Sequence, residues 1–170
     1  KPRAKDKGKS NLDWLMGMML ERWYQNDDRF YFLTGQSDVQ YKVYDFTFRL
    51  THGDQFRGGT GFVGSYAPIM RGELKKRIAA VTYQAPYDYL LLGHHHQQMW
   101  LPRAFCNGSL KGFDEFALQN SFTADPPQQM LFLVHPVRGV TFKLDIQVDE
   151  AEAERGEEKT WLDLEPAAAL

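Results

Sequence analysis

The chain has 170 residues, of which 43% are hydrophobic and 25% charged, a composition typical of one globular domain that excludes disorder throughout. Its formal net charge is −2, so no overall attraction to nucleic acid is expected. The two ends differ, because a basic arm occupies residues 1–9 and acidic residues dominate from residue 149 onward. Charged blocks of this kind are mostly solvated, and contact of the arm with phosphate is the less common outcome.

The cysteine and hydropathy patterns indicate where the protein resides. A single cysteine, Cys106, cannot form an internal disulfide and fits a reducing compartment. No run approaches the roughly 20 apolar residues that a membrane span needs, and the N-terminal charge lacks the apolar core of a signal peptide. We therefore expect a cytoplasmic protein that has no contact with a membrane.

The first predicted element is a helix that begins at Ser10 or Asn11 and ends near Asn26. Asp13 stands where a capping box places its acidic residue. The apolar residues recur at spacings of three and four, which predicts a stripe packed into the core. The stripe consists of Leu12, Leu15, Met16, Met19, Leu20 and Trp23.

Strands are predicted next. Residues 29–33 are expected to form a short strand, residues 35–38 a turn, and residues 40–50 a partly exposed antiparallel strand or hairpin because polar and apolar side chains alternate there. After glycine-rich residues 55–65, a helix is predicted over residues 68–83, and Pro86 ends it.

The remaining chain predicts several short strands, separated in part by a segment over residues 113–122. They cover residues 87–92, 104–106, 130–135 and 140–148, the last two joined by a turn at Arg138 and Gly139. Residues 1–149 are thus assigned to one α/β domain, and residues 150–170 to an acidic tail that is a frayed helix or disordered.

The run Gly-His-His-His at residues 93–96 directly follows the apolar strand and predicts a metal site. Glycine allows a sharp turn, and residues two positions apart project to one side, so His94 and His96 can address one small volume while His95 points elsewhere. Neutral imidazole binds Mn, Fe, Zn and Ni alike. His52 also follows an extended stretch and is a third candidate, whereas His135 is expected to be an ordinary surface residue.

Three motifs together resemble the C-terminal half of a calcineurin-like metallophosphoesterase, and most closely the phosphoesterase-like proteins of tailed phages. They are Thr-His-Gly-Asp at residues 51–54, Gly-His-His-His at residues 93–96, and Asn-Gly-Ser at residues 107–109. The resemblance implies a two-sheet β-sandwich flanked by helices and two divalent metal ions, Mn before Fe, Zn or Ni. His52 and His94 would share one ion and His96 would bind the other, with Asn107 in the turn beside them.

The family's earlier motifs have no match before His52. These are an Asp-x-His, a Gly-Asp with a bridging aspartate, and a Gly-Asn-His that supplies the catalytic histidine. The resemblance therefore implies that they precede Lys1, that this chain is roughly the second half of a catalytic domain, and that it is inactive by itself.

Two further patterns leave alternatives. Residues 53–58 also resemble the Gly-Asp-x-x-Asp-Arg-Gly motif of serine/threonine phosphatases, in which Asp54 would bridge the metals. Phe56 stands where that motif has its second aspartate. Alternatively, Asp54 orients an imidazole. Residues 59–64 match Gly-x-Gly-x-x-Gly, but the preceding strand is predicted to be antiparallel and Glu73 lies too near to bind a ribose. We expect a loop over the metal site and no dinucleotide cofactor.

The predicted function is metal-dependent hydrolysis of phosphate esters, with phosphodiesters of DNA or RNA as the predicted substrates. Arg57, Arg71 and Lys111 are candidate phosphate contacts. The alternative is a catalytically incomplete domain that binds a metal or a partner without turnover. A complete reading frame that supplies the earlier motifs would favour the enzyme.

Overall fold

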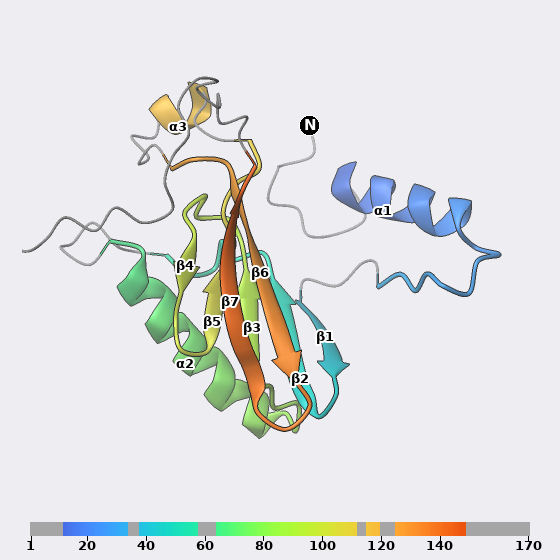
Figure 1. Cartoon of the computed structure of the whole chain (residues 1–170), viewed down its shortest axis with the longest axis horizontal. Coiled ribbons are helices and arrows are strands. Elements are labelled where there is room, and N and C mark those ends of the chain that lie inside the picture. The colour runs from blue at the N-terminus through green and yellow to red at the C-terminus, as the bar shows by residue number, and fades with distance from the viewer. Residues whose placement is uncertain (1–11, 34–37, 58–63, 112–114, 120–124, 149–170) are drawn as a thin grey trace, which may run out of the picture.

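The computed structural model describes residues 12–33, 38–57, 64–111, 115–119 and 125–148 (Figure 1). Within them the chain is mixed α/β, as predicted. The elements in chain order are α1 (Leu12–Trp23), β1 (Asp38–Val43), β2 (Phe46–Thr51), α2 (Tyr66–Thr82), β3 (Tyr89–Leu92), β4 (Met99–Trp100), β5 (Ala104–Cys106), α3 (Glu115–Gln119), β6 (Gln128–His135) and β7 (Gly139–Gln147).

Five strands form one mixed sheet in the order β1-β2-β3-β5-β4. The central strands β2, β3 and β5 are parallel, while β1 and β4 add antiparallel edges. The register aligns Thr51 with Leu92, and Leu92 with Cys106. Because these residues end their strands, the three loops that follow them leave the same edge of the sheet.

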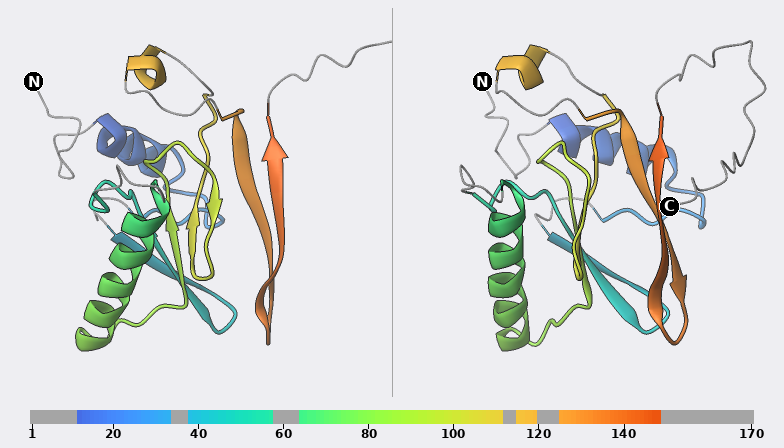
Figure 2. Two further views of the ribbon diagram at one scale, coloured as in Figure 1. Left: turned by 90° about the vertical axis from the view of Figure 1, so that its left-hand side faces the viewer. Right: turned by 60° about the vertical axis from the view of Figure 1, so that its left-hand side comes forward.

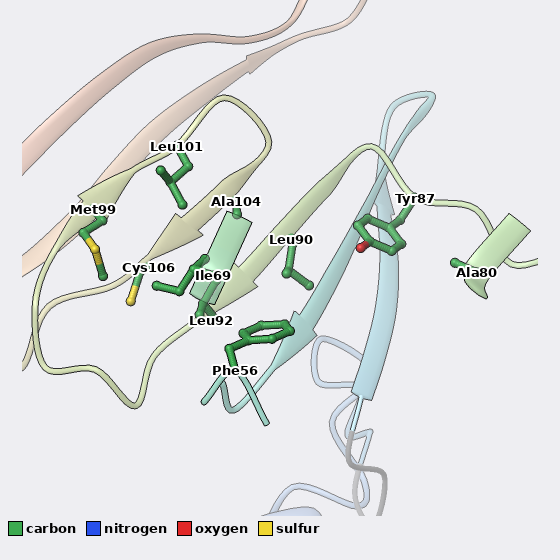
Figure 3. Packing of buried hydrophobic residues seen from close by; sticks show 10 residues of the cluster. All are labelled: Phe56, Ile69, Ala80, Tyr87, Leu90, Leu92, Met99, Leu101, Ala104 and Cys106. Atoms are coloured by element: carbon green, nitrogen blue, oxygen red, sulfur yellow. The ribbon is translucent and has the colours of Figure 1, made fainter. Parts of the chain in front are cut away.

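Helix α2 and the β6–β7 hairpin lie on opposite sides of this sheet (Figure 2). On the α2 side, Ile69 and Ala80 pack with sheet residues such as Leu90 and Leu92 in a buried apolar cluster (Figure 3). On the hairpin side, Phe132 of β6 stacks on Phe48 with 5.7 Å between ring centroids. The predicted arrangement of two packed sheets with a flanking helix is therefore confirmed.

Most predicted elements occur near their expected bounds. Residues 40–50 form the hairpin of β1 and β2, and the helix after the glycine-rich segment is α2. The short strand β4 was not predicted, because Met99–Trp100 has only two residues and carries no periodicity.

Two predictions were wrong. Residues 29–33 form no strand; Arg29 instead donates its backbone N–H and its guanidinium to Asp27, closing a turn, and Phe30 stacks on Tyr24. The apolar stripe of α1 is not core: Leu12 is 77% exposed and Trp23 82%, and no residue of α1 is buried. Spacing predicts which face of a helix is apolar, but it does not supply the surface that covers that face.

Several predictions lie outside the described residues. They concern the basic arm and helix start at residues 1–11, the turn at residues 35–37, the Gly-x-Gly-x-x-Gly segment up to residue 63 and the tail from residue 149 onward. Among the residues that are described, no helix is both long and apolar enough to span a membrane.

Candidate metal-binding site

The candidate site lies at the edge of the sheet where β2, β3 and β5 end. His52 follows β2, Gly93 follows β3, and Asn107 follows β5. Backbone hydrogen bonds tie the loops together, because Gly93 N–H donates to the His52 carbonyl at 3.1 Å and Asn107 N–H donates to the Leu92 carbonyl at 2.8 Å. The parallel register thus brings together three motifs that are far apart in the sequence.

His52 and His94 are in direct contact. Nε2 of His52 lies 3.2 Å from Nδ1 of His94, and the ring centroids are 5.0 Å apart with an interplanar angle of 61°. Both side chains are exposed, so solvent and ions reach the pair. The two nitrogens can share one proton, since one neutral ring donates and the other accepts.

Gly53 permits this close approach of the two loops. Its φ is +110°, and a Cβ there would lie 3.0 Å from the Gly93 carbonyl oxygen and 3.3 Å from Cβ of His94. An L side chain would be strained in that conformation and crowded by both neighbours. Glycine after His52 is therefore a geometric requirement for the His52–His94 contact.

The histidine run adopts an unusual backbone. His94 has φ of +68° and His96 of +56°, a region that non-glycine residues enter rarely. Between them, His95 N–H donates to the Gly93 carbonyl at 2.8 Å. This hydrogen bond closes a tight turn at the start of the histidine run.

His95 differs from its neighbours in its surroundings. Its ring lies edge-on to that of His94 with centroids 5.4 Å apart. Its Nε2 is buried, and no hydrogen bond to it occurs within the described part of the chain. Burial lowers the pKa of His95, and the nearby His94, His52 and His96 lower it further. A neutral imidazole is thus favoured at this position.

The His52–His94 pair fits a shared cation. Metal–imidazole bonds of about 2.0–2.1 Å place two ligands of one ion roughly 3.0–3.4 Å apart, and the two nitrogens lie 3.2 Å apart in the structure. Within the residues described, no three His, Cys, Asp or Glu side chains are grouped so that they could hold a metal. The structure therefore brings together two of the three predicted ligands and does not add His96 to them.

A network of polar side chains, not predicted from the sequence, anchors the strand that precedes His52. The Asp38 carboxylate accepts from Arg49 at 2.7 Å, from the Thr51 hydroxyl at 2.6 Å and from Lys76 of α2 at 2.5 Å. Burial alone would raise the pKa of Asp38, but hydrogen bonds from Lys76, Thr51 and Arg49 outweigh it and lower this pKa to about 2. The carboxylate thus joins β1, β2 and α2.

Thr51 links the Asp38 network to the loop that carries His52. Its hydroxyl donates to Asp38 and accepts from Nε2 of Gln55 at 2.8 Å. The turn that carries His52 is therefore held at both ends. No sequence signal distinguishes Asp38 from other polar residues in strands, because its partners lie 11, 13 and 38 positions away.

The other candidate residues have separate positions. Asp54 is half-buried in the loop after β2, and its carbonyl accepts from Nε of the exposed Arg57 at 3.3 Å. Asn107 faces the hairpin: its amide donates to Gln129 at 2.7 Å and its oxygen accepts from Met130 N–H at 2.9 Å. Two further candidate phosphate contacts, Arg71 on α2 and Lys111 after β5, are exposed.

Phe56 stands where the phosphatase motif has its second aspartate, and here it is a core residue. It is 7% exposed, and a Cβ added to Gly72 of α2 would lie 2.1 Å from its ring. The side chain therefore fixes the loop against α2. In the structure, position 56 therefore has a packing role.

Comparisons with known proteins give limited similarity. No known protein family and no curated protein matches the sequence. Among solved structures, the chain is similar to a single mutant of Vps29 from Entamoeba histolytica, with 15% identity and a TM-score of 0.40 over 72% of this chain and 67% of that one. Vacuolar Protein Sorting 29 from Cryptosporidium parvum gives 15% identity and 0.41 over 72% and 63%. Similarity at this level carries no information about function.

Proposed function

We propose that this chain carries part of the metal centre of a metallophosphoesterase that hydrolyses phosphate esters. The observation that supports the proposal is the 3.2 Å approach of His52 to His94, which are 42 positions apart in the sequence. Two motifs predicted to share one metal thus meet at the carboxyl edge of a parallel sheet, where loops from adjacent strands form a common site.

In this proposal the residues have distinct roles. His52 and His94 hold one divalent ion, Mn²⁺ before Fe, Zn or Ni, and His96 serves a second ion. Two such ions supply an acidified water and neutralise charge on the phosphoryl group. The half-buried Asp54 orients an imidazole or contributes a carboxylate. The remaining ligands and the proton donor for the leaving group come from residues outside these motifs.

The proposed substrate class is a phosphodiester, with DNA or RNA as the polymer. Arg57 is exposed and lies in the His52 loop, so its guanidinium can contact a phosphate beside the site. Because the net charge of the chain is −2, recognition of a polyanion would depend on such local contacts.

A second candidate is a domain that binds a partner without turnover. Two observations favour it: the described residues contain no three-ligand group, and hydrophobic side chains on α1 and on the β6–β7 hairpin are exposed. Large exposed apolar faces mark interaction surfaces in many proteins.

The test is hydrolysis of a generic phosphodiester by the protein from the full reading frame, supplied with Mn²⁺. Wild type is compared with His94→Ala, His96→Ala and, as a control, His135→Ala at the end of β6. Loss of turnover in the first two variants alone supports the hydrolase. Metal bound by an inactive wild type supports the partner-binding alternative, and turnover unchanged in His94→Ala contradicts the proposed centre.

A further inference from the structure

Helix α2 carries an exposed apolar stripe beside the face that it buries against the sheet. Its inner face is buried through residues such as Ile69 and Ala80. The outer residues are spaced by three or four positions and therefore lie on one side of the helix. They are Met70 (53% exposed), Leu74 (55%), Ile78 (61%) and Val81 (63%).

A pocket adjoins this stripe. It has a volume of about 340 Å³ and lies between α2 and the turn from β4 to β5. The stripe and the pocket share Met70 and Leu74, so they form one continuous surface. The opposite side of the pocket is formed by Leu101, Pro102 and Arg103. The shape suits one or two large apolar side chains of a short segment.

The charges around this surface are positive. Two basic residues of α2 are neutralised, because Arg77 pairs with Glu73 and Lys76 with Asp38. Two other basic residues of α2, Arg71 and Lys75, and Arg103 of the β4–β5 turn make no ion pair with any residue that the structure describes. An occupant of matching chemistry therefore combines apolar side chains with carboxylates.

The C-terminal segment of this chain has that chemistry. Residues 161–165 read Trp-Leu-Asp-Leu-Glu, and Glu157 and Glu158 precede them. Three large apolar side chains are thus combined with two acidic ones within five residues. Elsewhere in the chain, the apolar residues of α1 are accompanied by only two acidic ones, Asp13 and Glu21.

The segment can reach the pocket from the end of β7. Asp145 of β7 accepts from the Trp100 indole at 2.6 Å, and Trp100 directly precedes Leu101 of the pocket. The chain therefore leaves β7 close to β4. The 13 residues numbered 149–161 can span up to roughly 40 Å when extended.

We propose that residues 161–165 dock on the α2 stripe and its pocket within the same chain. Trp161, Leu162 and Leu164 cover the stripe and enter the pocket, while Asp163 and Glu165 pair with the three unpaired basic residues. This surface is separate from the histidine site and does not depend on the proposed hydrolysis.

The test follows the fluorescence of Trp161 in the full chain, obtained as the difference between wild type and Trp161→Phe. Docking predicts blue-shifted emission and weak quenching by acrylamide, both independent of protein concentration. Leu74→Glu places a carboxylate in the stripe, and it is expected to shift the emission to the red and restore full quenching. Charge reversal at Arg71, Lys75 and Arg103 together should have the same effect.

The matched control is Leu133→Glu on the outer face of the hairpin, since Leu133 is 56% exposed and Leu74 55%. This variant should leave Trp161 fluorescence unchanged. Circular dichroism and Mn²⁺ binding, which are expected to be the same in all variants, show that the fold is retained. Three results overturn the proposal: free quenching of Trp161 in wild type, release by Leu133→Glu instead of Leu74→Glu, or protection that depends on concentration and so indicates a second copy.

Discussion

Individual residues show which features of the site are required by geometry. Gly53 has no Cβ that could collide with the loop of His94, and Asp38 holds the strand before His52 through three donors. Neither residue is itself a candidate metal ligand. Both determine where His52 lies, and substitutions there should change stability together with the site.

Gly53→Ala should destabilise the protein by about 2–3 kcal/mol, because the residue has positive φ and the new methyl group meets Gly93 and His94. Urea denaturation measures this change. The control is Gly64→Ala, at φ of +52° with nothing within 4 Å of the added Cβ, which should cost about 1 kcal/mol. Equal losses in the two variants would show that crowding between the loops does not matter.

Asp38→Asn should cost about 2 kcal/mol at neutral pH, because the pKa of Asp38 falls from 3.8 to about 2 on folding. A lowered pKa in the folded state stabilises the protein above the unfolded value. This stability is lost as the pH falls from about 4 to about 2, where the folded carboxylate becomes protonated. Unfolding free energies measured across this pH range should therefore slope less in the variant, and a slope equal to that of wild type would contradict the network.

The secondary-structure elements are joined by a few specific contacts. Phe56 fixes the site loop to α2 at Gly72, and Asn107 fixes the end of β5 to β6 through Gln129 and Met130. These contacts explain why loops at one edge of the sheet keep a defined position. They also assign a structural role to Asn107, which the motif alone did not reveal.

Gly72→Ala should destabilise the fold by about 1–3 kcal/mol through overpacking against Phe56. Phe56→Leu removes part of the ring, so the double variant should lose less stability than the sum of the two single ones. A double-mutant cycle by thermal unfolding measures this coupling. Strict additivity would mean that the two residues do not touch in solution.

Asn107→Ala should cost about 1–3 kcal/mol, because Gln129 and Met130 both lose a partner. Asn107→Asp keeps an acceptor for Met130 N–H and is expected to retain more stability. Hydrogen exchange in β6 locates the effect, since the amide of Met130 should exchange faster in the alanine variant. If only metal binding changed, with β6 unaffected, Asn107 would belong to the site instead.

Comparison of sequence and structure shows what local patterns encode. Helix α2, the β1–β2 and β6–β7 hairpins and β3 follow from periodicity and turn residues, because their faces are defined within a short window. The strand expected at residues 29–33 fails because Asp27 closes a local turn with Arg29, which competes with extended structure. The burial of the α1 stripe could not be predicted, since it depends on a surface elsewhere.

The candidate site also depends on contacts between elements that are distant in the sequence. The meeting of His52 with His94 was predicted from a resemblance, and the parallel register of β2 and β3 provides it. The Asp38 network and the buried Phe56 depend on α2, which lies elsewhere in the sequence. Contacts between distant elements are therefore the part of the site that sequence patterns did not contain.

The whole molecule combines a well-packed centre with exposed apolar faces. The sheet is covered by α2 on one side and the hairpin on the other (Figure 2), while α1 has no buried residue. The outer hairpin face exposes Leu133, Phe142 and Leu144 at 56%, 48% and 45%. The histidine pair lies at one edge of this sheet, after the parallel strands β2 and β3.

The most direct test is calorimetric titration of the chain with Mn²⁺ at neutral pH. The proposed centre predicts that wild type binds Mn²⁺ and that His135→Ala binds it equally well. His52→Ala and His94→Ala should each bind at least tenfold more weakly, which corresponds to about 1.4 kcal/mol. Equal affinity in all four proteins, or no binding by wild type while it remains folded, would contradict the conclusion that His52 and His94 hold a metal together.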